Sequence, residues 1–192
     1  MKRNILLLVL LANLAVTVSA EVSHWVAPVY NFTRINTQTL NQYDFHSAGI
    51  RYALLTDKEF GFLGAAGLYL PIAYNNNGDS GSVFDSYNIP LNFDVLLGVG
   101  STISVELDNE FSAGLGVYLQ GIFLNHTDYE RYYFDSLTAG FGADFAYHFI
   151  VNEKYNLGAG VMTGFNFIDL LHKGPDRLLN GITFNTSILV GF

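Results

Sequence analysis

The chain has 192 residues, a length that suits one domain, and its formal charge of −8 reflects 17 acidic against 9 basic residues. So few lysines and arginines exclude a basic surface for nucleic acid. Only 14% of the residues are charged and 50% are hydrophobic, whereas a soluble domain carries about 25% charged residues.

Residues 1–20 have the pattern of a secretory signal peptide. Two basic residues follow Met1, an apolar run spans residues 5–18, and small residues precede Glu21. A membrane anchor is the alternative, but the run is shorter than the roughly 20 residues of a spanning helix. We therefore expect an exported domain over residues 21–192. Its formal charge is −10, because two basic residues leave with the signal peptide and the whole chain carries −8.

Eight later segments alternate apolar residues with small or polar ones, which is the period of a β-strand. They span residues 22–32, 43–55, 60–74, 88–105, 111–124, 134–151, 155–169 and 181–192. Most exceed the 9–11 residues, roughly, that a tilted strand needs to cross a bilayer. No apolar run after residue 20 is long enough for a spanning helix, so a closed barrel is the membrane structure that satisfies every backbone group. We expect Pro28 at a strand start or a barrel rim.

The connections between these segments alternate in length. Tight turns are predicted at residues 56–59, 106–110 and 152–154, and long polar links at 33–42, 75–87, 125–133 and 170–180. Short turns on one side and longer loops on the other are typical of outer-membrane barrels. An even number of strands places both chain ends on the side of the short turns.

The alternation also assigns an inner and an outer face. In the segment 88–105, Phe93 and Leu97 alternate with Asn92 and Asp94, and other segments repeat this pattern. The interior of an eight-stranded barrel is only wide enough for side chains to fill it. We therefore expect the glycine, serine, threonine and asparagine side chains inside and the bulky apolar ones outside, against lipid. A soluble lipocalin-like barrel, with apolar residues inside, is the alternative.

The signal peptide, the eight amphipathic segments, the turn and loop alternation and the aromatic last residue together resemble small bacterial outer-membrane barrels of the OmpA, OmpX and OmpW type. The resemblance implies an all-β fold, an eight-stranded antiparallel transmembrane up-and-down β-barrel, in the outer membrane of a Gram-negative-type bacterium. It also implies a monomer in contact with outer-membrane lipid, without a cofactor. The last strand would carry the signal for the barrel-assembly machinery, formed by Phe184, Ile188, Val190 and Phe192.

Charged and polar residues on the inner face form one candidate site. Arg51 lies on the inward parity of the second segment, and Asp94 and Asp144 on that of the fourth and sixth. A cation in a narrow lumen needs partners, because an unpaired buried charge is strongly penalised. We expect a cluster that fills the lumen, formed by Arg51, Asn92, Asp94, Tyr118, Gln120, Asp144 and Asn166. Such a cluster would either hold the interior together or act as the gate of a small conduit.

The long loops form a second candidate site. They carry aromatic and charged residues of the kind favoured at recognition surfaces, namely Phe84, Tyr87, Tyr129, Arg131, Tyr132 and Tyr133. A host or surface ligand is the expected partner there. Aromatic residues are also common at the bilayer interface, where we expect Tyr30, Tyr43 and Tyr74 near the loops.

Catalysis is not expected. The histidines are scattered, without the spacing of a metal site. His46 and Ser47 are adjacent in a strand and should face opposite sides. The sequence thus favours a barrel with a filled lumen that acts in surface interaction or membrane integrity through its loops. The alternatives are a narrow channel for small or hydrophobic solutes, as in OmpW-type proteins, and a soluble lipocalin-like ligand binder.

Overall fold

The computed structural model describes residues 22–56, 59–83, 90–106, 109–124, 134–150, 156–173 and 177–191. These residues form nine strands: β1 Ser23–Thr37, β2 Gln42–Leu55, β3 Gly61–Asn76, β4 Asp79–Ser82, β5 Leu91–Glu106, β6 Asn109–Leu124, β7 Phe134–Ile150, β8 Asn156–Lys173 and β9 Leu178–Gly191. In the described part of the chain, no helix has the length and apolar character to cross a membrane.

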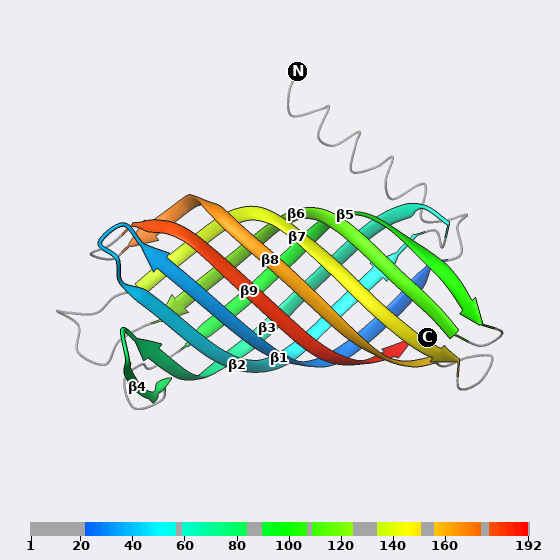
Figure 1. Ribbon diagram of the computed structural model, residues 1–192, viewed down its shortest axis with the longest axis horizontal. Helices are drawn as coiled ribbons and strands as arrows, with labels where there is room; N and C mark the ends of the chain where they lie inside the picture. Colours follow the sequence, from blue (N-terminus) through cyan, green and yellow to red (C-terminus); the bar gives the residue numbers. More distant parts are fainter. Residues whose placement is uncertain are drawn as a thin grey trace, which may run out of the picture.

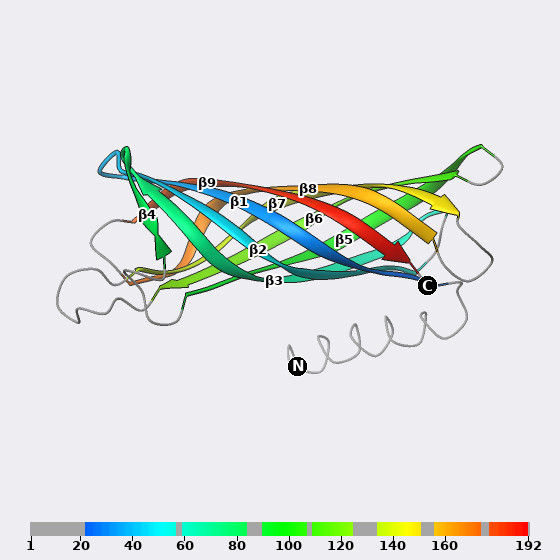
Figure 2. The same ribbon diagram turned by 90° about the horizontal axis from the view of Figure 1, so that it is seen from below.

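The eight long strands close into a barrel. Each pairs antiparallel with the next, β3 pairs with β5, and β9 returns to β1. The short strand β4 pairs with β3 at one end of the barrel (Figure 1). We call this end, where β1 also turns into β2, the loop end, and the opposite end the turn end (Figure 2). The predicted fold class, an eight-stranded antiparallel up-and-down barrel, is confirmed.

The first loop is shorter than predicted. The link expected at residues 33–42 shrinks to residues 38–41, because β1 continues to Thr37 and β2 begins at Gln42. The extra part of β1 still alternates, with Thr33 and Ile35 buried while Arg34 and Asn36 point outward. Toward the loop end, β1 therefore keeps the two-residue alternation of a strand, and only its outward side chains change from apolar to polar. Much of the link expected at 170–180 is also strand, because β8 continues to Lys173 and β9 begins at Leu178.

The link predicted at residues 75–87 contains a hairpin between β3 and β4. Asn77 and Gly78 both have positive φ angles, 51° and 93°, as the central residues of a type I′ turn require. The Asn-Gly pair is the usual sequence signal for this turn. Residues 84–89, which follow the hairpin, lie outside the described part.

The outer wall is apolar, as predicted. Phe141 is 64% exposed and Phe165 47% exposed, and the same face of the barrel presents Leu97, Leu115 and Ile188. The inner face holds glycine and polar residues together with buried apolar ones such as Leu63, Leu96 and Met162. The inside and outside faces are therefore those that the alternation indicated.

Pro28 lies well inside β1, not at its start or at a rim, so that expectation was wrong. It points outward. The pairing of β1 with β9 includes Val26–Val190, skips Ala27 and Pro28, and resumes at Val29–Ser187 without a change of register. Since proline has no N–H to donate to a ladder, its position coincides with this interruption of the pairing.

Two interior tyrosines depend on glycines beside them. The ring of Tyr118 occupies the space that a side chain at Gly164 would need, and Tyr69 does the same at Gly67. Both tyrosines are almost completely buried. These two rings therefore fit into the narrow lumen because glycine leaves space beside them.

We predict that Gly164→Ala lowers the free energy of unfolding by about 1–3 kcal/mol, because the new methyl group overpacks against the buried ring of Tyr118. The matched control is Gly181→Ala, where the nearest atom to the new group is the Arg34 carbonyl oxygen at 3.4 Å. Its stability should change by less than about 0.5 kcal/mol. Urea unfolding of the purified barrel measures both, and equal losses would contradict this account of Gly164.

Candidate functional site

The side chains inside the barrel are arranged in layers along its axis. On β1, the buried residues run from Val29 through Asn31 and Thr33 to Ile35. On β6, Tyr118 is followed by Gln120 and Ile122. These two strands thus pass from an apolar level through a polar level to a second apolar level, and the apolar level toward the turn end also includes Leu55, Leu63 and Leu189. We call these the turn-side core, the polar layer and the loop-end plug.

The loop-end plug closes the lumen above the polar layer. It consists of Ile35, Phe45, Val83, Ile122 and Leu124, with Tyr43 and Tyr74 packed against them. Tyr43 and Tyr74 therefore contact the plug, in contrast to their expected place in an outer aromatic belt. Tyr30 does face outward and is 49% exposed.

Gln120 is the centre of one half of the polar layer. Its amide nitrogen donates to Thr33 Oγ1 at 2.8 Å, and its amide oxygen accepts from Asn166 and Thr183, each at 3.0 Å. The Thr138 hydroxyl also donates to its backbone oxygen at 3.3 Å. These contacts join strands on opposite sides of the barrel, so Gln120 ties the wall together across the lumen.

Three asparagines form the other half. Asn92 donates to Asn31 Oδ1 at 2.9 Å, and Asn31 donates to Asn185 Oδ1 at 2.6 Å. The halves meet at Thr33, whose hydroxyl donates to Asn31 Oδ1 at 3.2 Å. All these side chains are buried, with exposures of 0% for Asn31 and Asn92 and 1% for Asn185.

Asp94 ends this chain of hydrogen bonds. Its Oδ2 accepts from Tyr69 at 2.9 Å, from Tyr118 at 3.3 Å and from Asn185 at 2.8 Å. Three neutral donors therefore offset much of the cost of burying this carboxylate. The two hydroxyls reach it because the tyrosine rings lie over glycines.

Arg51 and Asp144 form the buried ion pair of the lumen. The Arg51 Nη1 atom lies 2.9 Å from Asp144 Oδ1, and the two side chains are 4% and 6% exposed. Asp94 also attracts Arg51 electrostatically, but among the described residues no direct ion pair joins them. Of the two carboxylates expected around Arg51, the structure thus places Asp144 in contact and Asp94 on neighbouring tyrosines.

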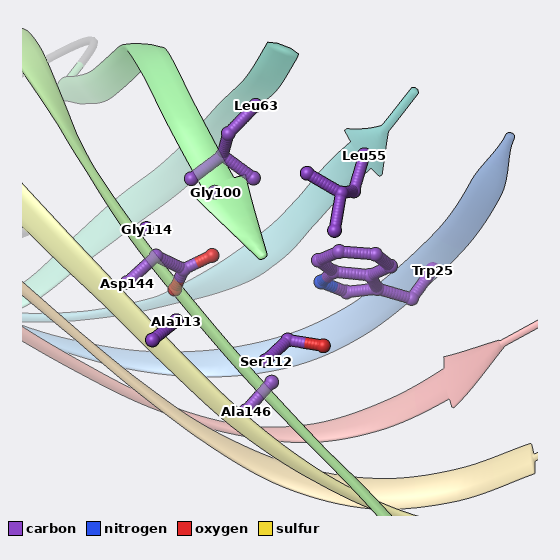
Figure 3. A pocket seen from close by; sticks show the side chains of 9 residues that line it. All are labelled: Trp25, Leu55, Leu63, Gly100, Ser112, Ala113, Gly114, Asp144 and Ala146. Carbon is purple, nitrogen blue, oxygen red and sulfur yellow. The ribbon is translucent and has the colours of Figure 1, made fainter. Parts of the chain in front are cut away.

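A small cavity of about 10 Å³ lies below this pair, toward the turn end. The Trp25 indole, the Leu55 and Leu63 side chains and the Asp144 carboxylate all turn toward it (Figure 3). This is about the space of one water molecule. His148 closes the region by packing its ring edge-on against Trp25 at 5.5 Å. The cavity is too small for an organic ligand.

The histidine and serine that are adjacent in the second strand do not come together in the structure. His46 points outward while Ser47 is buried on the inner side, so these neighbours do not face each other. In the described ranges, no group of three or more histidine, aspartate and glutamate side chains is placed to hold a metal ion. The polar groups of the lumen are instead arranged to bind one another across the barrel.

Several residues of the site were not predicted, although their positions in the strands contain the signal. Tyr69 shares its strand parity with Ala65 and Gly67, whereas Leu68 and Leu70 have the outward parity. Asn31, Thr33 and Thr183 likewise fall on inward positions. The partners of each side chain could not be derived, because the stagger of the strands around the barrel sets which residues meet across the lumen.

The two remaining sets of predicted residues are only partly described. Phe184, Ile188 and Val190 face outward on β9, with exposures of 47%, 60% and 43%, and Phe192 lies outside the described residues. The predicted loop residues Phe84, Tyr87, Tyr129, Arg131, Tyr132 and Tyr133 also lie outside the described residues.

We predict that Arg51→Met lowers the free energy of unfolding by about 3–5 kcal/mol, because it leaves Asp144 buried without its cation. The double variant Arg51→Met/Asp144→Leu should recover most of this loss. The control is Arg34→Gln, which breaks an ion pair whose arginine side chain is 42% exposed, at a cost of about 0–1 kcal/mol. Urea titrations of the three variants give the comparison, and equal losses in both single variants would refute it.

Comparison with known proteins supports the fold. No family model matches the sequence, and no curated protein matches it. The crystal structure of Neisserial surface protein A (NspA) has a TM-score of 0.53 at 12% sequence identity, over 88% of this chain and 95% of that one. The crystal structure of the outer membrane protein OprG from Pseudomonas aeruginosa has a TM-score of 0.55 at 10% identity, over 88% and 94%. The resemblance to small eight-stranded outer-membrane barrels is confirmed at the level of the fold.

Proposed function

We propose that the protein is an integral outer-membrane barrel with a filled lumen, which acts in surface interaction or membrane integrity through its loop end. The observation that carries this proposal is the buried polar layer, covered on both sides by apolar side chains, inside a barrel with an apolar outer wall. The function follows from the two surfaces that remain available to partners, the wall and the loop end.

The outer wall supports a membrane location. Outward residues such as Leu115, Phe141 and Ile188 are 60–64% exposed, and soluble proteins rarely leave so much contiguous apolar surface in water. The long strands have 14 to 18 residues, more than the roughly 9–11 needed to cross the bilayer, so the barrel would project beyond it. Neisserial surface protein A and the outer membrane protein OprG share this fold.

The filled lumen supports a role other than diffusion through the barrel. Asn31, Thr33 and Asn92 have 0% exposure, and their hydrogen bonds would have to break before a solute could pass. Each bond broken without replacement in a buried site costs about 1–3 kcal/mol. Several such bonds make the polar layer a stable barrier to solutes.

The loop end is then where specific recognition belongs, because binding residues concentrate on loops that a rigid scaffold presents. The β3–β4 hairpin already raises one part of this end above the wall. A host or surface ligand is the proposed partner of the loops. The outward residues of β9, together with Phe192, are the proposed signal for the barrel-assembly machinery, and residues 1–20 the proposed signal for export.

A narrow conduit for small solutes is the second candidate, and one observation favours it. Arg51 uses only Nη1 to bind Asp144, while its Nε and Nη2 atoms have no hydrogen-bond partner among the described residues. The guanidinium therefore has donors for a second carboxylate, such as Asp94. Movement of Arg51 between the two would be the opening step.

Planar-bilayer recording separates the two candidates. We predict no channel events from the purified barrel, because the plug and the polar layer block the lumen. Two variants identify the path of any events that do occur: Ser47→Leu adds volume at a buried inward position, and Ala66→Leu adds it to the outer wall. Channel events that disappear in Ser47→Leu but persist in Ala66→Leu would overturn the filled-lumen proposal and establish the conduit.

Membrane insertion itself is tested by placing arginine at two depths of the wall. Leu115 is 64% exposed near the middle of β6, and Val105 is 53% exposed near the turn end of β5. Folded in phospholipid vesicles, Leu115→Arg should lose about 2–4 kcal/mol of stability and Val105→Arg about 0–1 kcal/mol. Equal small losses, together with a protein that stays in buffer without detergent, would favour a soluble barrel.

A further inference from the structure

We propose that the outer wall formed by β9, β1 and β2 binds one phosphate-bearing lipid of the loop-side leaflet. An acyl chain would lie in a groove beside Pro28, and the phosphate would meet Arg34. The inference rests on the proposed membrane location and adds to it a specific lipid site.

The groove is a shallow, open hollow of about 430 Å³ in the outer wall. The three strands that form it lie side by side (Figure 1). Small residues and the proline make its floor, and Tyr30 and Ile188 stand beside them; the full lining is Pro28, Val29, Tyr30, Ala48, Gly49, Thr186, Ser187 and Ile188. Nearly all of this surface is apolar or small, which suits a hydrocarbon chain.

The gap in pairing explains why the hollow is here. β1 and β9 lack two pairs at Ala27 and Pro28. On β2, Pro28 pairs with Ile50, and the next outward residue toward the loop end is the small Ala48, which pairs with Tyr30. Elsewhere on the wall, large side chains stand on adjacent strands, as with Leu97 and Val117. A lipid chain packed against the wall would therefore find a recess beside Pro28.

A row of side chains in contact with one another leads from the groove to the loop end along the outward face of β1 and β2. The Tyr30 hydroxyl and His46 Nδ1 are 2.6 Å apart, and the His46 ring also packs against Phe32 at 5.3 Å. Arg34 follows, with its guanidinium carbon 5.7 Å from the centre of the Phe32 ring. An aromatic stretch that ends in an arginine is the arrangement expected where hydrocarbon gives way to headgroups.

Arg34 has donors left for a ligand. Its Nε and Nη2 atoms each bind one oxygen of Asp44 at 2.8 Å, so Nη1 takes no part in this pair. The Arg34 side chain is 42% exposed, compared with 11% for Asp44. Asp44 thus orients the guanidinium, and the exposed edge can bind a phosphate oxygen.

The distance from Pro28 to Arg34 along the barrel axis matches the thickness of the hydrocarbon in one leaflet. Pro28 and Arg34 are six residues apart on β1, which is about 20 Å along a strand and roughly 15 Å along the axis of a barrel whose strands tilt by about 40°. Half of a hydrocarbon core of about 30 Å is also roughly 15 Å. A chain that ends in the groove beside Pro28 therefore brings its headgroup to the level of Arg34.

The groove is tested by filling it. The protein is folded in vesicles of equal parts phosphatidylglycerol and phosphatidylcholine, extracted in mild detergent, and analysed by native mass spectrometry. We expect one retained lipid in the wild type and none in Ala48→Phe, whose ring would occupy the groove. Ala66→Phe is the control, because Ala66 is an exposed outward residue of β3 away from the groove, and it should retain the lipid.

The headgroup contact is tested by two variants that both break the Arg34–Asp44 pair. Arg34→Gln should lower the retained phosphatidylglycerol about fivefold, the effect of one arginine near an anionic surface. Asp44→Asn should leave it unchanged or raise it, since the cation remains. A merely structural role of the pair would make both variants lose lipid equally, and that result would overturn the headgroup assignment.

Three other results would overturn the lipid site or the proposed function. Equal lipid retention in Ala48→Phe, Ala66→Phe and wild type would mean a uniform annulus and overturn the site. Dimers in the wild type that Ala48→Phe abolishes, without a retained lipid, would assign the groove to a second copy of the chain. Band shifts on unboiled gels monitor folding of every variant. A wild type that fails to insert into vesicles would instead overturn the proposed function.

Discussion

The width of an eight-stranded barrel is the constraint on which the rest of this structure depends. Its interior holds side chains and little else, so each inward side chain must be small, polar with a partner, or packed into one of the two apolar clusters. Tyr69 and Tyr118 fit only because Gly67 and Gly164 leave room for their rings. The same lack of space leaves many bulky apolar residues on the outer wall, which determines where the protein can reside.

The narrow interior also explains why the asparagines, Gln120 and Asp94 form one connected network, beside the Arg51–Asp144 pair. A buried amide or carboxylate is costly unless it is hydrogen-bonded, and here each donor must find its acceptor on a strand across the lumen. Asn31 binds both Asn92 and Asn185, and Asp94 collects three donors. The network makes the barrel cross-section specific, because a shift of register by one residue would turn every one of these groups toward the outer wall.

Much of the fold could be predicted from the alternation of apolar with small or polar residues. A narrow lumen and an apolar outer wall leave only one way to orient the two faces of each strand. Arg51, Asp94, Asp144 and Gln120 could be placed inside for this reason. Their partners could not be predicted, because the stagger between strands decides that Arg51 meets Asp144 while Asp94 meets Tyr69. The rim was also mispredicted: polar outward residues such as Arg34 and Asn36 look like a loop in the sequence, although the strand continues through them.

The pairing of β1 with β9 has a consequence for how the molecule forms. The hydrogen bond between Asn31 and Asn185 joins positions 154 residues apart, so nearly the whole chain must be synthesised and ordered before it exists. Contacts of such high sequence separation form late and slowly. Because the asparagine chain spans this seam, the interior becomes fully connected only when the first and last strands meet. Until then the nascent sheet has two unpaired edges, and protection of those edges from other chains becomes the chief demand of its biogenesis.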